Sequence, residues 1–161
     1  MSGPSGQGGT DAERQAAAHL FNRAWELIDK SGRSEDDDVE MFLSAAASCW
    51  HWRQVGTAEQ VAVGEWQVAH VASLLGYGHL AMMFARRNLR AAQEAGWDGW
   101  RLASAHEGMA RACAACGDGA GRLAHFASAE EALERETGPE ERQVIADQLA
   151  SVPAVAPTAP D

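Results

Sequence analysis

A repeat with a period of about 41 residues constrains the fold of this chain more than any other feature. Gly76 and Gly117 each follow an apolar segment and lie 41 residues apart, and Gly96 and Gly138, which close the two units, lie 42 apart. In both units, helix-forming segments lie on either side of a glycine turn. This pattern is typical of stacked helix-pair arrays, in which each unit packs on its neighbours.

Helix boundaries are marked along the chain by capping residues and by glycines. A hydroxyl residue followed three positions later by an acid or amide can satisfy the free amides of a helix start. Such pairs occur at Thr10–Glu13, Ser34–Asp37, Thr57–Gln60 and Thr137–Glu140. Glycines that follow apolar runs act as stop signals. Together these signals predict seven helices, at residues 11–30, 36–54, 58–75, 78–95, 99–116, 120–136 and 140–151.

The fold class and the domain organisation follow from these helices. The connections between them are mostly two to five residues long, which favours antiparallel packing of successive helices. No segment alternates apolar and polar residues as a half-buried strand does. We expect an all-α protein of about seven antiparallel helices stacked as hairpins. Residues 10–151 form a single helical-repeat domain, whereas 1–9 and 152–161, rich in Gly, Ser, Pro and Ala, are expected to be disordered tails.

The two units carry small and aromatic residues at matching positions. These are Ala69 and Ala110 in the first helix of each unit, Gly76 and Gly117 at the turn, and Phe84-Ala85 and Phe126-Ala127 in the second helix. On these residues the chain resembles a tetratricopeptide-repeat-like protein over about residues 66–136. The family's usual repeat is shorter, at 34 residues, and its W-x-x-L-G-x-x-Y signature is absent. The resemblance implies a curved stack (a TPR-like α-solenoid) whose concave face binds another molecule.

Composition excludes several classes of partner. The formal net charge is −10, and a single lysine with twelve arginines cannot supply the broad basic face that nucleic acids or anionic membranes require. No run of about 18 apolar residues could span a bilayer. No secretory signal is visible at the N-terminus, and three cysteines form no disulfide framework. We expect a cytoplasmic protein that binds neither nucleic acid nor membrane.

Six tryptophans against one tyrosine is an unusual ratio. Trp50-His51-Trp52 ends the second predicted helix, and Trp66 lies in the third. The indoles can fill space between alanine-rich helices, or they can line a binding groove, because Trp is enriched at binding hot spots. Trp50 and Trp52 lie about 200° apart on a helix, so at most one of them faces the core.

Glu65 lies in phase with the apolar stripe of the third predicted helix, and His106, with Glu107 beside it, has the equivalent place in the fifth. Corresponding helices of neighbouring repeats adjoin, so Glu65 and His106 could face one another. Three alternatives follow: a structural pair with His or Arg, a ligand-binding or catalytic dyad, or groups that simply contact water. A buried carboxylate needs a partner or a raised pKa.

The remaining polar residues form no recognisable chemical motif. The histidines are scattered without helical ligand spacing, and Cys113-x-x-Cys116 lacks a second cysteine pair, so we expect no metal site and no cofactor. No nucleophile motif occurs. Arg86, Arg87 and Arg90 form a basic strip on the fourth predicted helix. The strip can receive an acidic peptide or anion, or it can be a solvated face.

Two functional hypotheses result. The first is a non-catalytic binding module for a protein or peptide, using a concave face that contains Trp52, Trp66 and the Arg86/Arg87/Arg90 strip. The alternative is a small-molecule- or metal-binding domain, in which catalysis is possible, with Glu65, His106 and Glu107 lining an interior pocket that Trp50 or Trp52 closes. A homodimer is a further possibility, because a short stack can bury exposed apolar surface by pairing.

Overall fold

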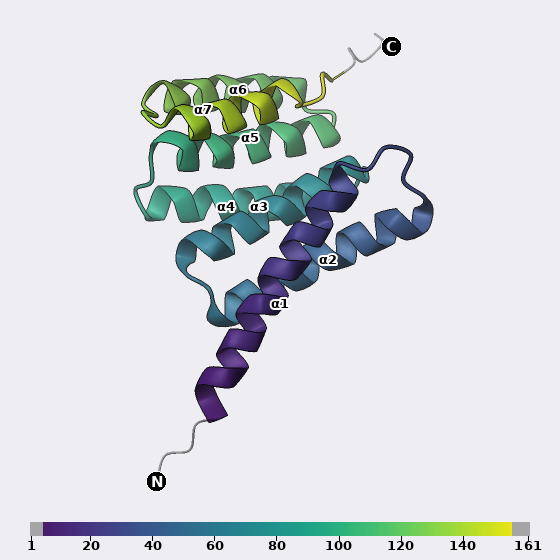
Figure 1. Cartoon of the computed structure of the whole chain (residues 1–161). Coiled ribbons are helices and arrows are strands. Elements are labelled where there is room, and N and C mark those ends of the chain that lie inside the picture. Colours follow the sequence, from purple (N-terminus) through teal and green to yellow (C-terminus); the bar gives the residue numbers. More distant parts are fainter. Residues whose placement is uncertain (1–4, 156–161) are drawn as a thin grey trace.

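The computed structural model describes residues 5–155, and the regular secondary structure in that range consists of helices alone. Seven helices follow one another (Figure 1): α1 (Ser5–Ile28), α2 (Glu35–Val55), α3 (Ala58–Leu74), α4 (Gly78–Glu94), α5 (Gly99–Ala115), α6 (Gly119–Glu134) and α7 (Pro139–Ala150). The predicted all-α class and the stacked helix hairpins are confirmed. Across residues 5–155, no helix is both long and apolar enough to cross a bilayer.

Two of the predicted capping pairs are present. The Ser34 hydroxyl accepts a hydrogen bond from the Asp37 amide at the start of α2, and Thr57 and Gln60 form the same reciprocal arrangement at the start of α3. In both, the third-position side chain also accepts from the capping residue's own amide. Two free amides of each helix are therefore satisfied within the first turn.

The other two capping predictions are wrong. Because α1 begins at Ser5, Thr10 lies inside the helix and not at its start. At α7 the capping position is occupied by Gly138, without a side-chain hydrogen bond, and Pro139 occupies the first turn. Residues 5–9 of the predicted N-terminal tail are helical, and Val152, at the edge of the predicted C-terminal tail, is buried. The rest of both predicted tails, 1–4 and 156–161, lies outside the described residues.

The 41-residue repeat is present in the structure. Helices α3 and α5 each span 17 residues, and their first residues are 41 positions apart. Gly76 and Gly117 end them in the left-handed conformation, with φ of 78° and 75°. In both turns the next amide closes the helix, Tyr77 bonding the Ala72 carbonyl at 2.8 Å and Asp118 the Cys113 carbonyl at 2.9 Å. Glycine is favoured there because it adopts positive φ without a side-chain penalty.

The helices form two rows. Each even-numbered helix pairs with the preceding odd-numbered one, and α3 contacts α1 and α5, while α5 contacts α7. Figure 1 shows the hairpins stacked from α1–α2 through α3–α4 to α5–α6, with α7 at the far end of the stack. The expected adjacency of the third and fifth helices is confirmed. One row, α1, α3, α5 and α7, therefore forms a face of its own, which is called the odd-helix face below.

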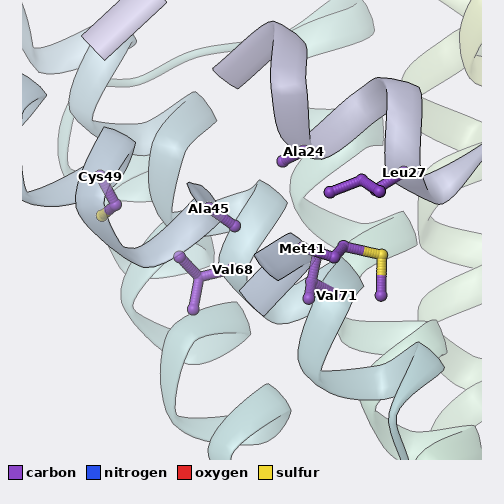
Figure 2. Packing of buried hydrophobic residues seen from close by; sticks show 7 residues of the cluster. All are labelled: Ala24, Leu27, Met41, Ala45, Cys49, Val68 and Val71. Atoms are coloured by element: carbon purple, nitrogen blue, oxygen red, sulfur yellow. The ribbon is translucent and has the colours of Figure 1, made fainter. Parts of the chain in front are cut away.

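The apolar core is distributed along the stack. A first cluster joins α1, α2 and α3 (Figure 2) through Ala24, Leu27, Met41, Ala45, Cys49, Val68 and Val71. A second cluster joins α3, α4 and α5, and a third joins α5, α6 and α7. Many members are alanines, whose small side chains let helix backbones approach closely. Each cluster spans three successive helices, so the stability of each unit depends on its neighbours.

Replacing Gly76 by Ala tests the turn geometry. Nothing lies within 4 Å of the position that a Cβ would occupy, so the cost is one of backbone conformation alone. We expect Gly76→Ala to lower the free energy of unfolding by about 1 kcal/mol, and Gly76→Asn to lower it less, since Asn tolerates the left-handed region. Urea unfolding followed by far-UV circular dichroism measures both. An Ala variant as stable as the wild type would contradict the assigned turn.

Candidate functional site

The odd-helix face is hollowed by a cavity of about 530 Å³. Helices α1, α3, α5 and α7, with one residue of α4 and one from the turn before α5, supply its wall, so it lies where four elements converge. Its lining is mostly aromatic and aliphatic: Phe21, Trp25, Glu59, Ala62, Val63, Trp66, Asn88, Trp97, Trp100, Arg101, Ser104, Glu140, Glu141, Val144, Ile145 and Gln148. This space is called the tryptophan cavity. Its volume and its mixture of apolar surface with few polar groups are those of ligand pockets.

A second hollow of about 410 Å³ adjoins the first. The two share Phe21, Glu59 and Val63 in their walls, and the second adds Trp52 from the end of α2. Five of the six tryptophans therefore line these two adjoining hollows, which together are called the depression below. The sixth, Trp50, is 63% exposed elsewhere on α2.

An aromatic cluster of Trp25, Trp66 and His70 lies at the tryptophan cavity, and its two indoles belong to the lining. The Trp66 ring lies 5.7 Å from Trp25 and 5.1 Å from His70, between ring centroids. Burial lowers the pKa of His70 to about 3, and the charge of Arg111 acts in the same direction. His70 is therefore neutral at physiological pH, and the cluster behaves as an apolar surface with fixed ring positions.

A buried ion pair holds Trp66 in place. The Trp66 indole Nε1 donates to Glu107 Oε2 at 2.7 Å, and Arg111 Nε donates to Glu107 Oε1 at 2.8 Å. Arg111 also donates to the Gln148 carbonyl at 3.0 Å and to the Ser151 hydroxyl at 2.8 Å. This group of hydrogen bonds, called the Glu107 network, links α3, α5 and the end of α7. Burial raises the pKa of Glu107, while Arg111 and Trp66 oppose that shift.

Charged groups surround the tryptophan cavity. Arg101 Nη2 lies 2.9 Å from Glu59 Oε2, and the Arg101 guanidinium lies over the Trp100 ring, 4.8 Å from its centroid. Glu140 and Glu141, in the first turn of α7, are exposed. Carboxylates near a helix start are favoured by the helix dipole. The lining thus carries three acidic side chains and one basic side chain, whose charge Glu59 already compensates.

Three lining residues each keep a buried polar atom without a hydrogen-bond partner among the described residues. They are Asn88 through Oδ1, Arg101 through Nε and Gln148 through Oε1. An unpartnered buried polar atom costs about 1–3 kcal/mol. The three residues line one space, so a molecule bound there can recover part of that cost once small side-chain adjustments expose these atoms.

The structure separates the residues of the expected interior pocket. Glu65 accepts a hydrogen bond from Arg87 at 2.8 Å and lies 3.6 Å from Arg53, whereas His106 faces His125 with 3.0 Å between their Nδ1 atoms. Within the described chain, no hydrogen bond or ion pair links Glu65 to His106. The alternative in which Glu65 forms a structural pair with Arg is the arrangement found. Glu107 lies in a third environment, beside Trp66.

The other predicted site residues divide between the cavity and the remaining surface. Trp66 and Trp52 line the depression, and His51 pairs with Glu13. Arg86 and Arg90 are exposed on α4, and Arg87 binds Glu65. The basic strip does not line the cavity; Arg101 is the arginine that does.

Several cavity residues were not among the predicted site residues. Trp97 precedes the capping residue of α5 and Trp100 lies in its first turn, so their closeness in sequence on either side of the helix start is the signal that could have been used. Trp25 and Phe21 lie in α1, outside the recognised repeat, so nothing in the sequence pattern points to them. Cys113 is buried and Cys116 is exposed. No cluster of three or more potential metal ligands occurs in residues 5–155.

Comparison with protein-family models, curated protein sequences and solved structures finds no match to this chain.

The buried histidine gives a testable pH dependence. In the unfolded chain His70 takes up a proton as the pH falls below its ordinary pKa of 6.5. In the folded chain, where its pKa is about 3, it does so only at much lower pH. Stability supplied by neutral His70 is therefore present above pH 6.5 and lost on acidification. We expect the free energy of unfolding to fall by about 2 kcal/mol from this group between pH 6.5 and 5.

Replacing His70 by Phe keeps a ring of similar size and removes the titrating group. Between pH 6.5 and 5 we expect the free energy of unfolding of His70→Phe to fall by about 2 kcal/mol less than that of the wild type. Urea titrations of both proteins at each pH measure this difference. Equal pH slopes for the variant and the wild type would show that His70 is not held neutral by burial.

Proposed function

We propose that this protein is a non-catalytic binding module that receives an extended segment of a protein partner along the depression on its odd-helix face. The observation that carries the proposal is the convergence of five tryptophans, from α1, α2, α3 and the start of α5, on two adjoining hollows. Large aromatic side chains dominate the energetics of protein interfaces. Here the tryptophans come from several helices and line a hollow at the surface, whereas tryptophans that only fill a core would be enclosed by it.

The shape of the depression supports an extended occupant. The tryptophan cavity and the adjoining hollow share one wall through Phe21, Glu59 and Val63, so together they form a trough that continues from Trp52 towards α7. A chain segment with side chains in both hollows uses this surface more fully than a compact molecule in either one.

The fixed position of the aromatic wall also favours binding. Trp66 is 5% exposed and is held through its indole N–H by Glu107. Side chains that are already immobilised lose little conformational entropy when a partner binds. The carboxylates nearest the wall have structural partners, Glu107 with Arg111 and Glu59 with Arg101, which supports a binding role without catalysis.

We also propose that the stack is a degenerate, long-period relative of the tetratricopeptide architecture. The matching lengths of α3 and α5 and the paired turns at Gly76 and Gly117 support this proposal. Homodimer formation stays one of the possibilities that the sequence suggests.

A small organic molecule in the tryptophan cavity alone is the second candidate. Its volume of about 530 Å³ suits such a ligand, and the three unpartnered polar atoms around it favour a compact polar group at the centre. Native mass spectrometry of protein purified without denaturation distinguishes this candidate, because a bound small molecule adds a discrete mass.

Affinity capture with matched variants tests the module. We expect a protein from extract of the source cells to be retained on the wild type and on Trp50→Ala, and to be lost on Trp97→Ala/Trp100→Ala, because only the latter pair lines the cavity. Quantitative mass spectrometry of the three eluates gives the comparison, and circular dichroism verifies that each variant is folded. The same proteins on all three, or no protein enriched on the wild type, would contradict the proposal.

A further inference from the structure

We propose that the segment bound in the tryptophan cavity is basic: a stretch of peptide in which Lys or Arg side chains are flanked by apolar ones. This inference rests on the proposed function and specifies the chemistry of its occupant. Three independent features of the lining support it: charge, aromatic faces and hydrogen-bonding capacity.

The charge of the lining is negative. Glu59, Glu140 and Glu141 stand against Arg101 alone, and Arg101 is already neutralised by its 2.9 Å contact with Glu59. The two carboxylates of α7 remain exposed, without an ion-pair partner among the described residues. The whole chain carries a formal charge of −10, so the long-range field also attracts cations and repels acidic segments.

The indole rings of the lining are suited to bind a positively charged side chain. A guanidinium or ammonium over an indole face is attracted by the ring's quadrupole, and Trp is the best of the aromatic side chains in this role. Arg101 already shows this combination of ring and carboxylate within the site, because its guanidinium lies over Trp100 and its Nη2 lies beside Glu59. A basic side chain of the partner, placed between the remaining indoles and Glu140 or Glu141, repeats that combination of ring and carboxylate.

The unsatisfied polar atoms require mainly donors. Asn88 is 6% exposed and bonds the Ala62 carbonyl through Nδ2, while its Oδ1, like Gln148 Oε1, has no donor among the described residues. Lys and Arg side chains carry only donors, and peptide N–H groups supply more. Arg101 Nε is the one donor among the three buried unpartnered atoms of the described lining, and it can donate to one backbone carbonyl of a bound peptide.

The apolar part of the lining is the reason to expect apolar residues beside the Lys or Arg side chains of the bound segment. Val144 on α7 is 54% exposed at the cavity, near Ile145 and Val63 in the same wall. Such surface accepts aliphatic side chains, and it also accepts the methylene stems of Lys and Arg, which pack on apolar surface while the charged end stays in polar surroundings.

Selection from a phage-displayed library of random peptides on immobilised full-length protein tests the inference. We expect enriched peptides to combine Lys or Arg with apolar residues. A synthetic peptide of the selected sequence, with blocked termini, is then titrated into the protein, and tryptophan fluorescence reports binding because five indoles line the depression. Its Kd is expected to rise with salt concentration, since exposed charges are screened.

A charge-matched pair of variants gives the decisive comparison. Glu140→Gln/Glu141→Gln removes two exposed carboxylates at the cavity, and Glu130→Gln/Glu134→Gln removes two exposed carboxylates of α6 that do not line it. Both variants change the net charge equally. We expect about a fivefold rise in Kd for the first and no change for the second, because only the first faces the bound cation. Equal effects of the two would overturn the inference.

The composition of the selected peptides separates this inference from the proposed function. Neutral or acidic peptides that bind the wild type and fail to bind Trp97→Ala/Trp100→Ala would refute the basic occupant and leave the binding module intact. A library without any enriched peptide would overturn both.

Discussion

The buried Glu107–Arg111 pair is the interaction on which the rest of this structure depends. Glu107 is fully buried and Arg111 is 3% exposed, so neither charge can turn to water if its partner is lost. Their hydrogen bonds reach Trp66 on α3 and Ser151 at the end of α7, and both residues lie on α5. Three helices of the odd-helix face are thereby held in one register. The alanine-rich core lets the helices pack closely. Small apolar side chains alone, however, specify poorly how one helix is positioned against the next.

The same pair connects stability to the shape of the binding surface. Taking a carboxylate and a guanidinium out of water is expensive, and an apolar replacement of similar volume is often as stable. What an apolar replacement cannot supply is a hydrogen bond to the Trp66 indole. The Glu107 network therefore has two roles: it links the helices of the stack, and it fixes the position of an aromatic wall. Arg101 and Glu59 act similarly near the cavity, since their contact holds a guanidinium over Trp100.

Local signals predicted most of the fold, whereas the site depends on contacts between helices. The Thr57 cap and the glycine at position 76 act within a few residues of chain, so sequence spacing alone located them. Helical phase correctly placed Glu65 on a buried stripe, but its partner Arg87 belongs to the following helix, and phase cannot show which neighbour a side chain meets. Trp25 escaped prediction because α1 lies outside the repeat and joins the cavity only through packing on α3.

The most direct test compares two buried carboxylates by urea unfolding. Glu65→Ala leaves Arg53 and Arg87, whose side chains are 44% and 46% exposed, free to turn to water, so we expect a loss of about 1–2 kcal/mol. Glu107→Ala strands a buried Arg111, and we expect a loss of about 3–5 kcal/mol or no folded protein. Equal losses, or a smaller loss for Glu107→Ala, would contradict the claim that the Glu107 network organises this molecule.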